Sequence, residues 1–201
     1  MSERIIINAK NMNIGQGNTN NGIACIGDNN TNDIAVRSKK KKTETEKAKE
    51  MVKEKEKVFI VHGHDAEAKF EVARFIEKIG FEPIILHEQV NDGMTVIEKI
   101  EKYSNVGFGI VLYTPCDVGY AKNEENKKMA RARQNVVFEH GYLISKLGRN
   151  NVCALVKEAV EIPNDTSGIV YIPLDNNGGW KIPLAKEMKS SGYEIDFNAF
   201  M

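Results

Sequence analysis

Five short apolar runs alternate with amphipathic stretches from residue 58 to the end of the chain. Most runs are apolar throughout and rich in Val and Ile, which is typical of strands buried on both faces of a parallel sheet. The stretches between them have the length and period of helices, so the alternation predicts a flavodoxin-like three-layer α/β fold with a parallel sheet. The fifth run is the least regular, because a loop rather than a clear helix precedes it. The runs are VFIVHG, EPIILH, VGFGIVLYT, NVCALV and GIVYIPL, and the expected helices span residues 66–79, 95–103, 129–147 and 180–190.

Two segments of different texture precede this α/β domain, which we assign to residues 58–201. Residues 1–37 are rich in Asn and Gly and contain a twelve-residue repeat, because IGQGNTN from Ile14 returns as IGDNNTN from Ile26. The repeat predicts short stacked strands, and since two repeats bury little surface, a second copy of the chain would complete the stack. A disordered polar tail is the alternative interpretation. Residues 38–57 are almost entirely charged or helix-forming, which predicts a solvated helical linker.

The charge balance and the cysteines narrow the classes of function. The 28 basic and 28 acidic residues give a formal net charge of zero, so no overall basic field exists to bind nucleic acid or an anionic membrane. The three cysteines, Cys25, Cys116 and Cys153, are widely spaced, which fits a reduced cytosol and no structural zinc site. No apolar run approaches the ~20 residues that span a bilayer. We therefore expect a cytoplasmic protein that binds neither membrane nor nucleic acid and holds no metal.

The loops after the apolar runs are the first places to search for a ligand site, because ligands of such folds bind at the carboxyl ends of the strands. After the first run, Gly63 allows close backbone approach and Asp65 is placed to cap the next helix, although a plain tight turn is the alternative. After the second run, Gly93 lies in a polar loop suited to be a mobile flap or a contact loop. The third run leads into a long polar connection that starts at Thr114 and carries Asp117 and Arg133.

Several familiar catalytic motifs are absent from the sequence. It contains no GxGxxG fingerprint, P-loop, HExxH motif or GxSxG elbow. A phosphoacceptor receiver domain, which shares the predicted fold, would need an Asp at the end of the third run, where this chain reads LYTP. The sequence therefore argues against a Rossmann dinucleotide site, an NTPase, a zinc protease of that type and a receiver.

The stretch QNVVFEHGYLISKLG predicts a helix with a carboxylate, Glu139, at the edge of its apolar stripe. At about 100° per residue, the helical neighbours of Glu139 are Asn135, Val136, Tyr142 and Leu143, and none of them is a cation. Glu139 therefore either points past the stripe into water or forms a partly desolvated carboxylate in a cleft. The second arrangement is typical of a catalytic acid, base or cation stabiliser.

Three other residues near Glu139 have different expected roles. Arg133 and Asn135 lie one to two turns before it, close enough to orient a substrate, although an ordinary surface position also explains either residue alone. His140 falls at the centre of the apolar stripe, so we interpret it as a core histidine held by one hydrogen bond rather than as a catalytic group.

Several long stretches together closely resemble the bacterial TIR-like domain of anti-phage effectors in the CBASS and Pycsar systems. They are VFIVHGHDAEAKFEVARFIEKIGFEPIILHEQ, YSNVGFGIVLYTPCDVGYAK, RARQNVVFEHGYLISKLGRNNVCALVK and SGIVYIPLD. The resemblance covers residues 57–197, and its most specific part is RARQNVVFE with its spacing to the loop after the first run.

The resemblance implies an NAD⁺ hydrolase whose catalytic glutamate is Glu139. It also implies a nucleotide pocket, to which we assign Gly63, His64, Asp65, Gly93, Thr114, Asp117, Arg133 and Asn135 as substrate-binding residues. The chain departs from the family pattern in having His140 directly after the glutamate, where an apolar residue is common. Effectors of this class usually also carry a sensor module or a membrane segment, and neither is visible in the sequence. The activating signal is therefore open, and a cyclic nucleotide and a protein are the two candidates.

The leading hypothesis is a cytoplasmic NAD⁺ glycohydrolase that acts in anti-phage defence as a homo-oligomer, with NAD⁺ as substrate and no cofactor. Breaking the nicotinamide–ribose bond builds an oxocarbenium-like cation, and one well-placed carboxylate can stabilise it. Two alternatives use the same domain. One is a non-catalytic TIR-like nucleotide-binding or interaction module, and the other is a cyclase that joins the ends of ADP-ribose.

Overall fold

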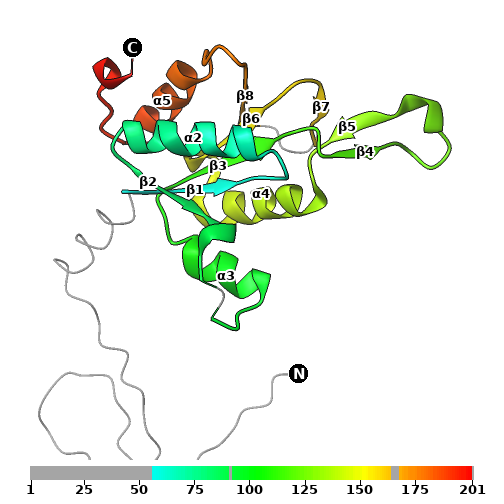
Figure 1. Ribbon diagram of the computed structural model, residues 1–201, viewed down its shortest axis with the longest axis horizontal. Helices are drawn as coiled ribbons and strands as arrows, with labels where there is room; N and C mark the ends of the chain where they lie inside the picture. The colour runs from blue at the N-terminus through cyan, green and yellow to red at the C-terminus, as the bar shows by residue number, and fades with distance from the viewer. Residues whose placement is uncertain (1–55, 91, 164–167, 201) are drawn as a thin grey trace, which may run out of the picture. The chain divides into compact units, whose positions relative to one another are not determined.

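A five-stranded parallel sheet forms the centre of the domain, in the order β2-β1-β3-β6-β8 (Figure 1). The computed structural model describes residues 56–90, 92–163 and 168–200, so the N-terminal repeat and nearly all of the charged segment lie outside the described residues. Every predicted strand is present, and the least regular one, β8, pairs in parallel with β6. The strands are β1 (Lys57–Val61), β2 (Glu82–Ile85), β3 (Phe108–Tyr113), β6 (Val152–Val156) and β8 (Val170–Pro173).

Helices cover both faces of this sheet, as the apolar runs predict (Figure 1). In β1, Val58 and Ile60 belong to one core cluster and Phe59 and Val61 to the other, because successive side chains of a strand point to opposite faces. The first cluster includes residues of α2 (Ala66–Lys78) and α5 (Lys181–Ser190), and the second includes residues of α3 (Val96–Tyr103) and α4 (Gln134–Leu147). The predicted flavodoxin-like three-layer α/β fold is therefore confirmed.

The connection after β3 differs from the prediction, because it contains a β-hairpin that extends beyond the end of the sheet (Figure 1). Strands β4 (Asp117–Gly119) and β5 (Met129–Arg131) pair antiparallel, and β5 also pairs with β7 (Val160–Glu161). The helix expected from residue 129 therefore begins only at Gln134. Met, Ala and Arg are good helix formers, but here the pairing with β4 and β7 outweighs that local preference.

Short 3₁₀ turns complete the connections, at η1 (Leu86–Glu88), η2 (Glu125–Lys127), η3 (Arg149–Asn151) and η4 (Phe197–Ala199). Two helix starts follow the capping rules. The Asp65 carboxylate accepts a hydrogen bond from the Ala68 amide, and Thr95 forms a reciprocal capping box with Glu98. No helix in the described part of the chain is long and apolar enough to cross a membrane.

Candidate active site

Glu139 lies on α4, which buries one stripe against the sheet and turns the other side to solvent. Val136 and Leu143, one turn before and after Glu139, are 2% and 0% exposed. Glu139 itself is half-buried and lines two neighbouring hollows at the carboxyl ends of β1 and β2. Of the two arrangements that the sequence leaves open, the structure has the partly desolvated carboxylate in a cleft.

The first hollow has a volume of about 510 Å³ and is polar on one side. It lies between α4 and the β1–α2 loop, and two cations, Lys69 and Arg133, belong to its lining. Each cation already faces a carboxylate outside the hollow: Lys69 Nζ is 3.3 Å from Glu88 Oε1, and Arg133 Nη1 is 3.5 Å from Asp117 Oδ1. In the described part of the chain, neither cation forms an ion pair with Glu139.

The second hollow, of about 450 Å³, lies between α4 and the β2–α3 connection. It shares His87, Asn135 and Glu139 with the first hollow, so Glu139 stands where the two meet. Its remaining wall is largely apolar, and it consists of Leu86, Gly93, Met94, Val96 and Lys99. A ligand with one anionic part and one apolar ring would find complementary surfaces on the two sides of the carboxylate.

Burial raises the pKa of Glu139 to about 7. Glu139 makes no hydrogen bond or ion pair with any residue of the described ranges. Lys146, the nearest cation along the same helix, donates instead to Ser104 Oγ at 2.9 Å and to the Glu101 carbonyl at 3.1 Å. The carboxylate is thus desolvated without a compensating charge, an arrangement concentrated at functional sites.

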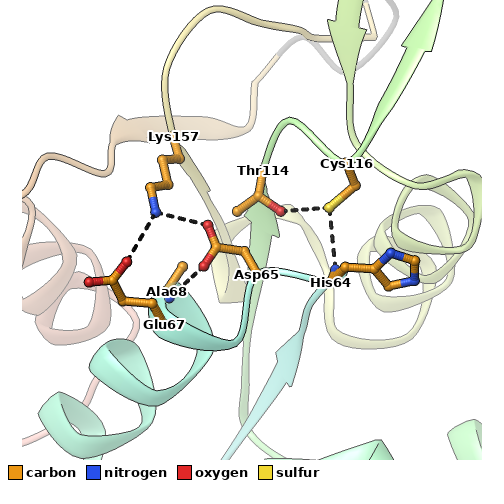
Figure 2. A network of polar contacts seen from close by, with 7 residues as sticks. All are labelled: His64, Asp65, Glu67, Ala68, Thr114, Cys116 and Lys157. Carbon is orange, nitrogen blue, oxygen red and sulfur yellow. Dashed lines mark hydrogen bonds and ion pairs between the residues drawn. The ribbon is translucent and has the colours of Figure 1, made fainter.

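The β1–α2 loop forms the wall opposite α4 and contributes Gly63 and His64 to the first hollow. At Gly63, the close approach that glycine allows is to a thiol, because a Cβ there would lie 2.6 Å from Cys116 Sγ. The same sulfur lies 3.3 Å from the donating His64 amide (Figure 2). The next residue, Asp65, turns away from the hollow toward α2 and Lys157 (Figure 2).

The structure divides the predicted substrate-binding residues into two groups. Gly63, His64, Arg133 and Asn135 lie with Glu139 around the first hollow, and Gly93 lies with Glu139 and Asn135 in the second. The other group, Asp65, Thr114 and Asp117, lines neither hollow. Asp65 caps the helix behind the loop, Asp117 faces Arg133, and the buried Thr114 hydroxyl lies 3.1 Å from Cys116 Sγ.

Four lining residues carry chemistry that sequence reasoning did not single out: His62, Lys69, His87 and Lys99. His62 Nδ1 donates to the Gly63 carbonyl at 2.7 Å, its ring centroid lies 5.1 Å from that of His87, and burial lowers its pKa. The sequence could have indicated His62 and His87, because both follow apolar runs, where ligand sites of this fold are expected. No sequence feature distinguishes the two lysines, because solvated lysines are common on helices of this kind.

His140 is a core histidine, as predicted. Its side chain is 1% exposed, its Nδ1 lies 2.8 Å from the Tyr113 hydroxyl, and burial lowers its pKa to about 4. A neutral imidazole in this position ties α4 to the central strand β3 directly beside Glu139. Across residues 56–90, 92–163 and 168–200, no group of three or more His, Cys, Asp or Glu side chains is placed to hold a metal ion.

Comparisons with known proteins identify one matching family and two similar proteins. The sequence profile of the family described as "CAP12/Pycsar effector protein, TIR domain" matches residues 57–176. The chain is 50% identical over 140 residues to the Escherichia coli (strain K12) protein YuaY, a match that covers 69% of this chain and 46% of YuaY. It is 44% identical over 125 residues to the Dictyostelium discoideum protein tirC, covering 57% of this chain and 62% of tirC.

The chain therefore spans less than two thirds of the length of either relative. The family profile covers more than half of the chain, and its matched range runs from β1 into the segment after β8, including the helix that carries Glu139. The chain belongs to the CAP12/Pycsar effector TIR-domain family.

Proposed function

We propose that this protein is an NAD⁺ hydrolase that cleaves the bond between nicotinamide and ribose, with Glu139 as its catalytic residue. The observation that carries the proposal is the Glu139 carboxylate, half-buried where two hollows meet and without an ionic partner among the described residues. Membership of a TIR-domain family of defence effectors supports the same assignment. A carboxylate in this position has a partner only when a cationic ligand or transition state arrives.

In the proposed reaction, the bond from ribose C1′ to the pyridinium nitrogen breaks and its electron pair leaves with neutral nicotinamide. Positive charge then develops on C1′ and the ring oxygen, where the ionised Glu139 carboxylate stabilises it. Water adds to C1′ and loses a proton, giving ADP-ribose. Nicotinamide leaves without protonation, so one carboxylate suffices, and the apolar wall that includes Val136 strengthens its field.

The lining of the two hollows supports a dinucleotide as the substrate. Lys69 and Arg133 supply positive charge to the first hollow, where a pyrophosphate would bind. Leu86, Met94 and Val96 give the second hollow an apolar wall that suits a flat ring. Both volumes fall within the range of about 300–1,000 Å³ that is usual for small-molecule pockets.

We further propose that the enzyme acts as an anti-phage effector in the cytoplasm and becomes active on assembly into a homo-oligomer, triggered by a cyclic nucleotide or a protein. The family supports the role in defence. The repeat in residues 1–37, which lies outside the described residues, is the proposed site of self-association. Assembly dependence predicts that activity per molecule rises with protein concentration.

The test is incubation of the purified chain with NAD⁺ over a range of protein concentrations, with nicotinamide and ADP-ribose followed by chromatography. Glu139→Gln keeps the shape of the side chain and removes its charge, so it should abolish nicotinamide release while retaining the fold. Glu77→Gln, at an exposed glutamate of α2, is the matched control and should leave turnover unchanged.

Three results would change the assignment. Equal turnover by Glu139→Gln would remove Glu139 from the mechanism. A cyclic product in place of linear ADP-ribose would make the protein a cyclase with the same site. No nicotinamide release at any concentration would favour a TIR-like binding or interaction module, or an enzyme that awaits its activator.

A further inference from the structure

The β1–α2 loop forms one wall of the first hollow, yet its position depends on residues from other strands. Figure 2 shows two side chains that reach it from different sides: Cys116 at the His64 amide and Lys157 at the Asp65 carboxylate. Lys157 Nζ donates to Asp65 Oδ2 at 2.8 Å, while Asp65 Oδ1 accepts from the Ala68 amide at 2.9 Å. The Asp65 carboxylate is therefore held at both oxygens.

Lys157 also connects to the opposite wall of the hollow through its backbone. It directly follows β6, and its amide donates to the Tyr113 carbonyl at 2.9 Å. The Tyr113 hydroxyl lies 2.8 Å from Nδ1 of His140, the neighbour of Glu139 on α4. One residue thus joins the loop on one side of the hollow to the strand that holds the catalytic helix on the other.

The Lys157–Asp65 pair is more enclosed than an ordinary surface ion pair. Both side chains are 20% exposed, whereas the members of the Lys181–Glu71 pair, further along the same helix α2, are 34% and 37% exposed. Lys157 lines neither hollow. A lysine in this position can act on a ligand only through the residues that it holds.

We propose that Lys157 is a positioning residue that fixes the β1–α2 loop, through Asp65, at the distance from Glu139 that a bound nucleotide requires. The part of this inference that concerns NAD⁺ rests on the proposed function. The loop contacts the substrate before and during the reaction alike, so its loosening weakens binding in both states. Lys157→Met should therefore raise the KM for NAD⁺ about fivefold and leave kcat within about twofold.

A second measurement reports on the loop without any turnover. Cys116 Sγ lies against Gly63 and accepts from the His64 amide, so a loosened loop exposes this thiol. Alkylation by iodoacetamide, followed peptide by peptide by mass spectrometry, should be at least about threefold faster at Cys116 in Lys157→Met than in the parent. Cys153, which is 1% exposed on β6, reports global unfolding and should react equally slowly in both.

Two further variants make the experiment decisive. Lys157→Arg keeps the charge and should restore both the protection of Cys116 and the KM. Lys181→Met breaks the more exposed pair on α2 and should change neither quantity. An unchanged alkylation rate at Cys116 in Lys157→Met, or an unchanged KM with faster alkylation, would overturn the proposal. A parent chain that does not hydrolyse NAD⁺ at all would count against the proposed function and not against this inference, and the alkylation rates would still decide whether Lys157 holds the loop.

Discussion

Two carboxylates flank the first hollow and differ in their partners: Glu139 lines the hollow, and Asp65 lies behind the loop that forms the opposite wall. Burial alone would raise the pKa of Asp65, but the Ala68 amide and the Lys157 ammonium outweigh it and hold that pKa below its ordinary value. Glu139 is buried with no such partners, and its pKa rises to about 7. Asp65 is thus satisfied within the protein, whereas Glu139 is not.

The difference separates an acid that is paired within the fold from one that is not. Asp65 stabilises the folded state, because its carboxylate accepts hydrogen bonds from both the Ala68 amide and the Lys157 ammonium. Glu139 destabilises the folded state at neutral pH, because its charge is desolvated and no compensating hydrogen bond or ion pair is formed with the described residues. Under the proposed function, this unfavourable free energy is offset when Glu139 stabilises a cationic transition state at the junction of the two hollows.

The strongest way to break this contrast is to give Glu139 the partner that it lacks. Asn135 lies one turn before it and lines both hollows, so Asn135→Arg places a guanidinium within reach of the carboxylate. Under the proposed function, the new ion pair competes with the transition state, and NAD⁺ turnover should fall about 100-fold or more. Steady-state kinetics of nicotinamide release measure the effect.

Gln134→Arg is the control for this prediction. Gln134 is exposed and lies at the start of the same helix, but it lines a different hollow, beside Arg131 and Val137. The same charge placed there should change turnover by less than about twofold. Equal losses in both variants would mean that added positive charge on α4, rather than pairing with Glu139, reduces activity.

The sequence predicts the sheet and its layers because each central strand is buried on both faces and therefore reads as an unbroken apolar run. It does not predict β5, because Met129 and Arg131 favour a helix locally. Ala130 and Arg131 pair with Val160 and Glu161, about thirty residues further along the chain. The pairing of β5 with β7 across that separation leaves no local pattern in the sequence, so β5 is evident only in the tertiary structure.

In the candidate site too, the sequence indicates what depends on local structure and not what depends on the tertiary fold. Glu139 is recognisable from the sequence because a helix places its neighbours at known positions, and none of them is a cation. The partner of Asp65 is not recognisable, since Lys157 is 92 residues away and reaches it only through the order of the strands. His87 and Lys69 reach the hollow from other parts of the chain, so their meeting with Glu139 also depends on the tertiary fold.

A pH–rate profile sharpens the comparison, because Glu139 must be ionised to stabilise a cation. With its pKa at about 7, kcat/KM for NAD⁺ should rise with pH and level off above that value, increasing about thirtyfold between about pH 5.5 and 8. Asp65 is ionised throughout this range and contributes no slope. A profile that is flat from pH 5.5 to 8 would mean that the carboxylate does not act as the ionised group in the free enzyme.

The stability of Glu139→Gln provides a test that needs no substrate. A carboxyl whose folded-state pKa is raised keeps its proton longer in the folded state, so its cost is absent below about pH 4.5 and complete above about pH 7. Glu139→Gln should therefore be more stable than the parent by roughly 1–3 kcal/mol at pH 8, with the difference shrinking toward pH 5. Urea unfolding at several pH values measures it, and Glu77→Gln should show no such trend.

Asp65→Asn should give the smallest effect and the opposite sign. Asparagine caps a helix about as well as aspartate, so the variant keeps the Ala68 hydrogen bond and loses mainly the charge that faces Lys157. The free energy of unfolding should fall by about 0.5–1 kcal/mol at pH 7. Because the folded-state pKa of Asp65 is lowered, this contribution is present above its unfolded value near 3.8 and is lost only as the pH falls through the folded value. The loss should therefore be constant between about pH 5 and 8, the interval in which the gain from Glu139→Gln changes most. If urea unfolding showed the two variants changing in parallel over that interval, the assignment of one carboxylate to structure and the other to function would be wrong.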